Sequence, residues 1–187
     1  MAESENSKDL ISVLWSGADI LRSKMDANEY KDYLLGIVFY KYLSDSFLIK
    51  VYDLVYDEKP ETLKVALDAY VEALEDESSE ELKVQLKAEC HYVIEPELTY
   101  TCFADAARNN SFNREQLQKA FNNIEQSDPL FADLFTDIDL YSNRLGTGDQ
   151  KQSDTISNVI KEIDKGDLLK RRSRGEKRWQ NQRTARI

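Results

Sequence analysis

The sequence has 187 residues, a length typical of one domain, and its 35 acidic and 25 basic side chains give a net charge of −10 at pH 7. A chain this acidic repels a phosphate backbone unless basic residues gather on one face, which disfavours extensive DNA binding. Two cysteines provide no disulfide framework, and neither a signal peptide nor a membrane-spanning run is recognisable, so we expect a cytoplasmic protein.

The first two predicted helices meet at Asp26. On one face of the first, apolar residues recur at intervals of three and four: Leu10, Leu14, Ala18, Leu21 and Met25. Asp26 and Glu29 have the spacing of a capping box, which predicts that the second helix begins at about Ala27. That helix, ending at about Tyr56, is apolar nearly all round, so it belongs at the centre of a domain. We expect Phe39 to lie in the core, where replacement by alanine would cost about 3–5 kcal/mol.

A long, ordered signature runs through this helical pair. It consists of Trp15, Ala18-Asp19, Leu21-Arg22, Met25, Glu29-Tyr30-Lys31, Leu35-Gly36, Phe39, Lys41-Tyr42 and Ser44-Asp45. The signature resembles the opening of the modification (M) subunit of type I restriction–modification systems, an adenine-N6 DNA methyltransferase. Weaker similarity continues through 93–96 and 135–146 and fades after about Leu169. The resemblance implies an N-terminal helical domain that lies beside the specificity subunit, a second M subunit and bound DNA.

The remaining segments follow from periodicity and turn chemistry. We predict a helix over 61–75, a helix over about 78–88 capped by Ser78 or Ser79, and an irregular stretch over 91–110 that includes a short strand or an extended crossing. Further along, we predict a helix over 114–125 capped by Ser111 or Asn113, a turn of helix from Asp128 to Leu134, a loop over 137–148 and a last helix capped by Ser153.

The final 18 residues reverse the charge of the chain. Residues 170–187 contain eight basic residues and one acid, a net of +7, which leaves 17 basic and 34 acidic residues, a net of −17, in residues 1–169. We therefore divide the chain into a helical domain over 1–169 and a basic tail over 170–187. The tail is foreign to the family pattern: either a truncated or frame-shifted end or an authentic regulatory tail. We expect it to dock on acidic protein, within the chain or across an oligomer, and to bind DNA only weakly and in a salt-dependent manner.

The motifs for methyl transfer are absent from these 187 residues. The resemblance implies that the parent enzyme binds S-adenosylmethionine through a glycine-bearing turn after a strand, and adenine through an Asn-Pro-Pro-aromatic loop. Pro60, Pro96 and Pro129 are far apart, and the only close glycine pair, Gly146 and Gly148, lacks a strand–turn–helix context. We therefore expect this chain to hold no cofactor and to be inactive by itself as a methyltransferase.

Other chemistry is weakly supported. Cys90, His91 and Cys102 could bind zinc only with a fourth ligand that the spacing does not supply, so a half-buried structural pair is the favoured interpretation. The acidic residues between positions 72 and 81 lack the alternating spacing of a calcium loop and indicate a solvated face.

The polar residues of the signature are the candidates for contacts. Asp19 and Arg22 lie three residues apart and are expected to pair. The charged residues within the second helix either form salt bridges between helices or face a partner or DNA. The candidate partner-facing or DNA-facing residues are Arg22, Lys31, Lys41, Arg171, Arg172 and Arg174.

The sequence therefore predicts an all-α fold, an irregular bundle of five to seven helices around a long central apolar helix. The resemblance implies that its function is to assemble an M subunit with the specificity subunit and a second M subunit, with DNA reached through the complex. An uncovered signature surface would also favour self-association. The alternative is a stand-alone helical interaction or regulatory module that uses the same domain.

Overall fold

The computed structural model describes residues 2–166, with side chains from residue 11 onward; residue 1 and residues 167–187 lie outside this part. The helices are α1 (Ala2–Arg22), α2 (Ala27–Tyr56), α3 (Leu63–Glu75), α4 (Ser79–Cys90), α5 (Tyr100–Arg108), α6 (Arg114–Ser127) and α7 (Asp149–Asp164), with 3-10 turns η1 (Pro96–Leu98) and η2 (Pro129–Phe131). Residues 2–166 contain no strand, so the predicted all-α bundle is confirmed. None of the helices in this range is long and apolar enough to cross a membrane.

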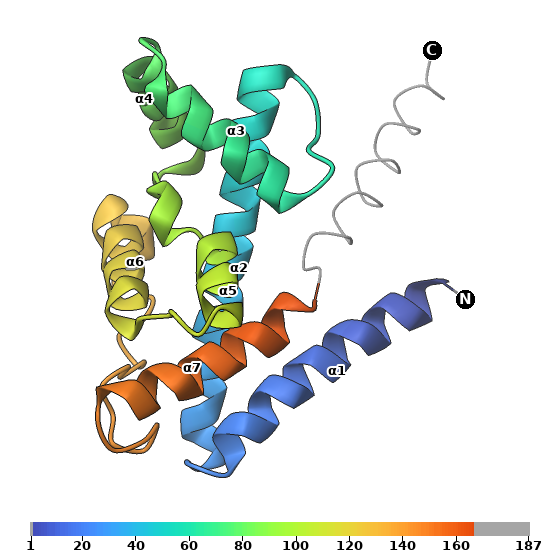
Figure 1. Cartoon of the computed structure of the whole chain (residues 1–187), viewed down its shortest axis with the longest axis vertical. Coiled ribbons are helices and arrows are strands. Elements are labelled where there is room, and N and C mark those ends of the chain that lie inside the picture. The colour runs from blue at the N-terminus through green and yellow to red at the C-terminus, as the bar shows by residue number, and fades with distance from the viewer. Residues whose placement is uncertain (1, 167–187) are drawn as a thin grey trace.

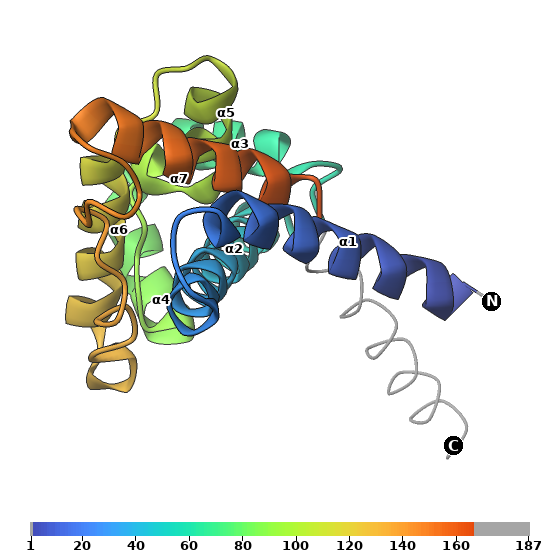
Figure 2. The ribbon, with the colours of Figure 1, turned by 90° about the horizontal axis from the view of Figure 1, so that it is seen from below.

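The long helix α2 passes through the bundle, and the other helices pack around it. Helices α1 and α7 lie side by side, and α6 lies on the opposite side of the bundle from α1 (Figures 1 and 2). Helices α3 and α4 cover the C-terminal end of α2 (Figure 1). The predicted central helix is confirmed with the bounds that the sequence indicates.

The capping box at the start of α2 is also confirmed. The Asp26 carboxylate accepts hydrogen bonds from the backbone N–H groups of Asn28 (3.0 Å) and Glu29 (3.3 Å). The Glu29 carboxylate accepts from the Asp26 N–H at 3.4 Å, so both partners of the box are satisfied. These bonds stop α1 and α2 from merging into one continuous helix.

Tyrosine hydroxyls join the central helix to the irregular segments. Tyr33 donates to the Asp139 carbonyl (2.5 Å) and Tyr40 to the Leu98 carbonyl (2.7 Å), while Tyr92 donates back to the carbonyl of Leu43 (3.0 Å). The ring of Tyr40 is fully buried against three phenylalanine rings, those of Phe103, Phe121 and Phe135. This burial raises the pKa of the Tyr40 hydroxyl well above its usual value, so the group remains a donor.

A glycine allows the loop before α7 to touch α2. A Cβ atom added at Gly36 would lie 1.9 Å from Cδ1 of Ile138, which is buried in that loop. The predicted loop over 137–148 therefore packs directly on the central helix instead of extending into solvent.

Three local predictions were wrong. The stretch over 91–110, expected to be irregular, contains η1 and α5 and no strand, and before η1 only residues 92–95 within it belong to no helix, turn or bend. Its buried residues Tyr100, Phe103, Ala104 and Ala107 do follow a helical spacing, but α5 is only nine residues long. Ser78 does not cap α4 with its side chain, because its hydroxyl donates to Asp76 instead.

The third error concerns the start of α7, which begins four residues before Ser153. Its N-cap is Gly148, and Ser153 is buried within the helix. Tertiary contacts hold the additional turn: Gln152 donates to the carbonyls of Tyr141 (2.9 Å) and Ser142 (3.2 Å). The helices α3 and α6 start and end close to their predicted positions, and Asn113 caps α6 as expected.

The expectation that Phe39 lies in the core was wrong. Its side chain is 38% exposed, and it shares the outer face of α2 with Leu35 and Tyr42. The buried face of the same helix carries Ile37 and Phe47. Because nearly every side of α2 is apolar, composition alone could not show which side faces outward.

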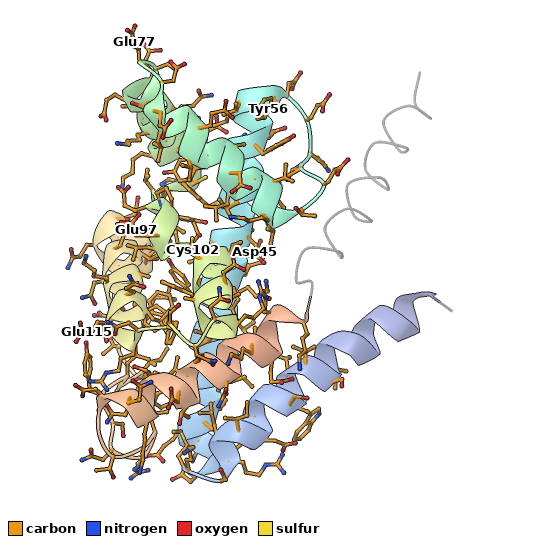
Figure 3. The ribbon with its side chains drawn as sticks, viewed as in Figure 1. Asp45, Tyr56, Glu77, Glu97, Cys102 and Glu115 are labelled. Carbon is orange, nitrogen blue, oxygen red and sulfur yellow. The ribbon has the colours of Figure 1, made fainter. Side chains whose placement is uncertain are left out.

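Lys41 lies inside the bundle in a buried ionic network. Its Nζ is 2.8 Å from Oδ2 of Asp45 and 3.8 Å from Oδ1 of Asp164, and it lies over the ring of Tyr100 at 4.8 Å from the centroid. Arg108 also pairs with Asp164. Figure 3 shows Asp45 on α2 at the level of α5. The network thus joins α2, α5 and α7.

Phe47 and Phe39 lie on the same helix, and their replacement by alanine tests whether Phe47 is buried and Phe39 is partly exposed. We expect Phe47→Ala to lower the free energy of unfolding by about 3–5 kcal/mol, because it leaves a cavity against Tyr70 and Tyr92. Phe39→Ala should lower it by less than about 1 kcal/mol, since the ring is partly exposed. Urea denaturation followed by circular dichroism measures both values, and equal losses would contradict the assignment.

A second matched pair tests the ionic network. Lys41→Met should lower the free energy of unfolding by about 3–5 kcal/mol, because it leaves the Asp45 carboxylate buried without its cation. Lys31→Met, on an exposed part of the same helix, should change it by no more than about 0.5 kcal/mol. A Lys41→Met variant as stable as the parent in urea would show that the network is dispensable.

Candidate interaction surface

The outer face of α2 presents a row of large apolar side chains. Leu35, Phe39 and Tyr42 are spaced four and three residues apart, so they lie together on one side of the helix. Their exposed fractions are 58%, 38% and 36%, and the rings of Phe39 and Tyr42 are 6.4 Å apart between centroids. We call these three residues the α2 outer row. Exposed apolar side chains that lie together are typical of protein interaction surfaces.

Lys31 lies one helical turn before the α2 outer row. Its side chain is 58% exposed, and Nζ is 3.8 Å from Oδ1 of Asp32. Because Lys31 and Leu35 are four residues apart, the ammonium group borders the apolar row. A positive charge beside exposed aromatic rings suits the polar rim of a protein interface.

Helix α1 exposes a second set of signature residues. Ile11 is 51% exposed and Trp15 is 57% exposed. The Arg22 guanidinium lies over the Trp15 ring at 5.6 Å and pairs with Asp19 at 2.7 Å, which confirms the predicted Asp19–Arg22 pair. These contacts hold the Arg22 side chain in place at the surface while leaving about half of it accessible.

The other candidate contact residues fall elsewhere. Lys41 was a candidate for facing a partner or DNA, but its side chain is 4% exposed and pairs with Asp45 and Asp164, which confirms the salt-bridge alternative at this position. Arg171, Arg172 and Arg174 lie outside the described residues. Of the six candidates, Arg22 and Lys31 are therefore the two that the structure places on the surface.

The residues considered for metal binding form ordinary contacts. His91 Nδ1 is 3.2 Å from Oδ2 of Asp128, and the Lys87 ammonium donates to the carbonyl of His91 at 2.9 Å. A hydrogen bond from the Leu130 N–H, followed by the His91 contact, lowers the pKa of Asp128. Burial raises the pKa of the Cys90 thiol, which keeps it protonated. Within the described range, no three His, Cys, Asp or Glu side chains are grouped so that they could hold a metal ion.

The α2 outer row is the feature that sequence reasoning missed. Phe39 was assigned to the core and was not grouped with Leu35 and Tyr42 on one exposed side. The helical period of 3.6 residues places the row on the opposite side of α2 from Tyr33, Ile37 and Tyr40. These three residues are all buried. One apolar side of α2 therefore packs on the core of the domain, and the other is exposed.

Comparison with known proteins identifies the family of this domain. The family model described as HsdM N-terminal domain matches residues 10–163. A solved structure of the type I restriction–modification system methyltransferase subunit from Streptococcus thermophilus is 47% identical, with a TM-score of 0.83. The similarity covers 88% of this chain and 35% of that subunit, so the chain spans about a third of the length of this relative. This chain belongs to the HsdM N-terminal domain family, the helical domain of type I restriction–modification methyltransferase subunits.

Proposed function

We propose that this domain is the assembly module of a type I adenine-N6 DNA methyltransferase, and that the α2 outer row binds the other parts of that complex. The specificity subunit, a second M subunit and the rest of the methyltransferase subunit are the proposed partners. The observation that carries the proposal is the exposure of Leu35, Phe39 and Tyr42 on the signature helix of an M-subunit domain. Aromatic and aliphatic anchors of this kind supply most of the binding energy at protein interfaces.

The charges around the row support a protein partner over direct DNA binding. The domain carries a net charge of −17 over residues 1–169, which opposes a phosphate backbone. Arg22 and Lys31 add local positive charge, but Asp19 and Asp32 lie beside them. We therefore propose that DNA is reached through the complex, with these two residues contributing to the rim of the interface. An uncovered α2 outer row would also cause the isolated domain to self-associate.

The proposed role assigns the chemistry to other parts of the enzyme. In the described residues, Gly148 caps the start of α7 and follows a loop, so the only close glycine pair of the chain has no preceding strand. Without a strand–turn–helix unit, the backbone offers no cradle for a nucleoside cofactor. S-adenosylmethionine is accordingly a cofactor of the full-length enzyme in this proposal, and this domain does not hold it.

We expect the purified chain to show no S-adenosylmethionine binding in isothermal titration calorimetry. The physical reason is the missing glycine-bearing turn between a strand and a helix, where the backbone could approach the cofactor closely. A catalytic M subunit of a type I system, titrated under the same conditions, is the positive control. Saturable micromolar binding to the 187-residue chain would contradict this part of the proposal.

The assembly role is tested by removing the apolar anchors. We expect Leu35→Ser/Phe39→Ser/Tyr42→Ser to weaken binding to the specificity subunit of the same system by about 30-fold or more, since anchor residues contribute about 2 kcal/mol or more. The matched control is Val84→Ser/Leu130→Ser, because these side chains are 70% and 74% exposed and lie on α4 and η2. Kd values from titration calorimetry, with circular dichroism to verify folding, decide the outcome. An unchanged Kd for the folded triple variant would refute the assignment of the interface.

A further inference from the structure

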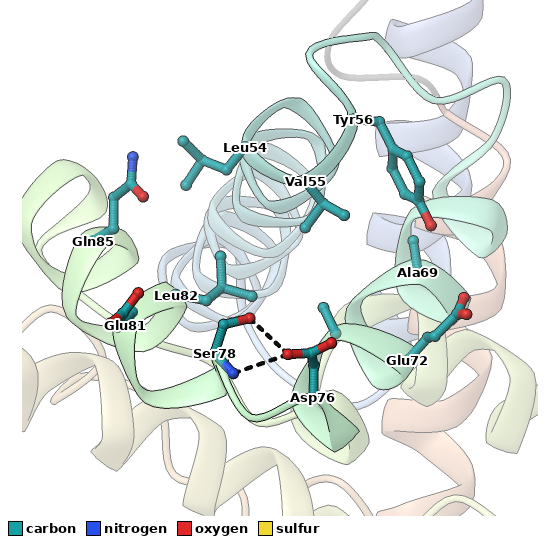
Figure 4. A pocket seen from close by; sticks show the side chains of 11 residues that line it. Leu54, Val55, Tyr56, Ala69, Glu72, Asp76, Ser78, Glu81, Leu82 and Gln85 are labelled. Carbon is teal, nitrogen blue, oxygen red and sulfur yellow. Dashed lines mark hydrogen bonds between the residues drawn. The ribbon is translucent and has the colours of Figure 1, made fainter.

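A groove lies at the C-terminal end of α2, far along that helix from the α2 outer row. It has a volume of about 410 Å³ and is formed by the last turn of α2, by α3 and by the start of α4 (Figure 4). The apolar part of the groove's lining consists of the side chains of Leu54, Val55 and Leu82. Helix α3 adds the small side chains of Ala69 and Ala73. Val55 and Tyr56 are 38% and 47% exposed, so the groove presents apolar surface to solvent.

The charges lining the groove are all negative. Glu72, Asp76 and Glu81 contribute carboxylates, and the residues that line the groove include no lysine, arginine or histidine. Ser78 donates to the Asp76 carboxylate from its backbone N–H (2.9 Å) and its hydroxyl (3.0 Å), as Figure 4 shows. These bonds lower the pKa of Asp76 and keep it ionised.

Two helix ends add to this negative potential. Both α2 and α3 end at the groove, and neither has a basic residue in its last turn. The carbonyl end of a helix carries about half a negative charge, which in most helices attracts a nearby lysine or arginine. The groove therefore fits a ligand that is both cationic and apolar, and it repels phosphate.

The chain itself contains a segment with this chemistry. Residues 170–187 carry a net charge of +7 and include Trp179. Arginine forms paired hydrogen bonds with carboxylates, and an indole ring contributes a large apolar surface. The basic residues that could meet the three carboxylates are Lys170, Arg171, Arg172, Arg174, Lys177, Arg178, Arg183 and Arg186.

The segment is long enough to reach the groove within one molecule. Oδ1 of Asp164 is 3.8 Å from Nζ of Lys41, so the end of α7 lies beside the middle of α2. Lys41 and Leu54 are 13 residues apart on that helix, a rise of roughly 20 Å. Gly166 and Trp179 are also 13 residues apart, and an extended chain of this length spans up to about 45 Å.

We propose that the groove between α2, α3 and α4 binds the chain's own segment 170–187, with its basic side chains on Glu72, Asp76 and Glu81 and Trp179 on the apolar part of the groove's lining. Bound in this way, the segment neutralises the acidic end of the bundle. It is also withheld from DNA, because the same arginines and lysines cannot contact phosphate while they pair with carboxylates. This inference does not depend on the proposed assembly role.

Fluorescence of Trp179 in the full-length chain tests the proposal. In a Trp15→Phe background Trp179 is the sole tryptophan, since the sequence contains two. We expect this residue to be protected from acrylamide quenching at low salt, and to lose that protection in Glu72→Gln/Asp76→Asn/Glu81→Gln. The matched control, Glu97→Gln/Glu115→Gln/Asp137→Asn, removes the same charge from exposed sites elsewhere and should retain protection. Equal quenching in the two triple variants would overturn the proposal.

Reversing the charges of the segment and of the groove distinguishes loss of binding from misfolding of a variant. Arg171→Glu/Arg174→Glu leaves the helical domain unchanged and should also expose Trp179. Adding Glu72→Lys/Glu81→Lys should restore protection, which a purely structural defect could not do. Failure of this rescue in a chain with normal circular dichroism would overturn the proposal. Protection that rises with protein concentration would also overturn it, because the occupant would then come from a second copy.

Discussion

The structure depends on hydrogen bonds between tyrosine hydroxyls and backbone carbonyls that join the central helix to the irregular segments packed against it. Helix α2 supplies the donors Tyr33 and Tyr40, and it supplies the Leu43 carbonyl that accepts from Tyr92. The partners at Leu98 and Asp139 belong to segments that lack the internal hydrogen bonds of a long helix. A buried carbonyl without a donor costs about 1–3 kcal/mol, so the Tyr40 hydroxyl both satisfies the Leu98 carbonyl and fixes the position of that segment.

Ion pairs also join the helices, in addition to the tyrosine hydrogen bonds. Lys41 lies between carboxylates from α2 and α7, and Arg108 of α5 pairs with the same Asp164. At the other end of α7, the largely buried Arg114 pairs with Asp149 at 2.7 Å and stacks on the Tyr141 ring at 4.4 Å. Removing one partner of a buried ion pair costs about 3–5 kcal/mol, because the other charge is then left buried and unpaired. Here the ion pairs hold both ends of α7 in one register relative to α2, α5 and α6.

One side of α2 packs on the core, and we propose binding at two other regions of the helix. Its outer face carries Leu35, Phe39 and Tyr42, which suit a large apolar contact with another protein. Its C-terminal end borders a groove of carboxylates that suits a basic segment. The two surfaces differ in chemistry, so the helix could bind an apolar partner at one site and a cationic segment at the other without competition between them.

The sequence by itself determined the class of fold, the bounds of α2, its capping box and the family. These features depend on local chemistry: Asp26 and Glu29 bond to backbone three residues away, and the apolar content of 27–56 exceeds what a surface helix carries. Tertiary structure decided which side of α2 faces outward, because Phe39 and Phe47 are chemically alike and differ only in what packs against them. It also decided that Lys41 is buried, that α5 forms within 91–110, and that α7 starts at Asp149. These outcomes depend on partners that are distant in the sequence, such as Asp164, 123 residues from Lys41, and Tyr141, 11 residues from Gln152. A local sequence pattern does not predict such partners, because they become neighbours only when the chain is folded.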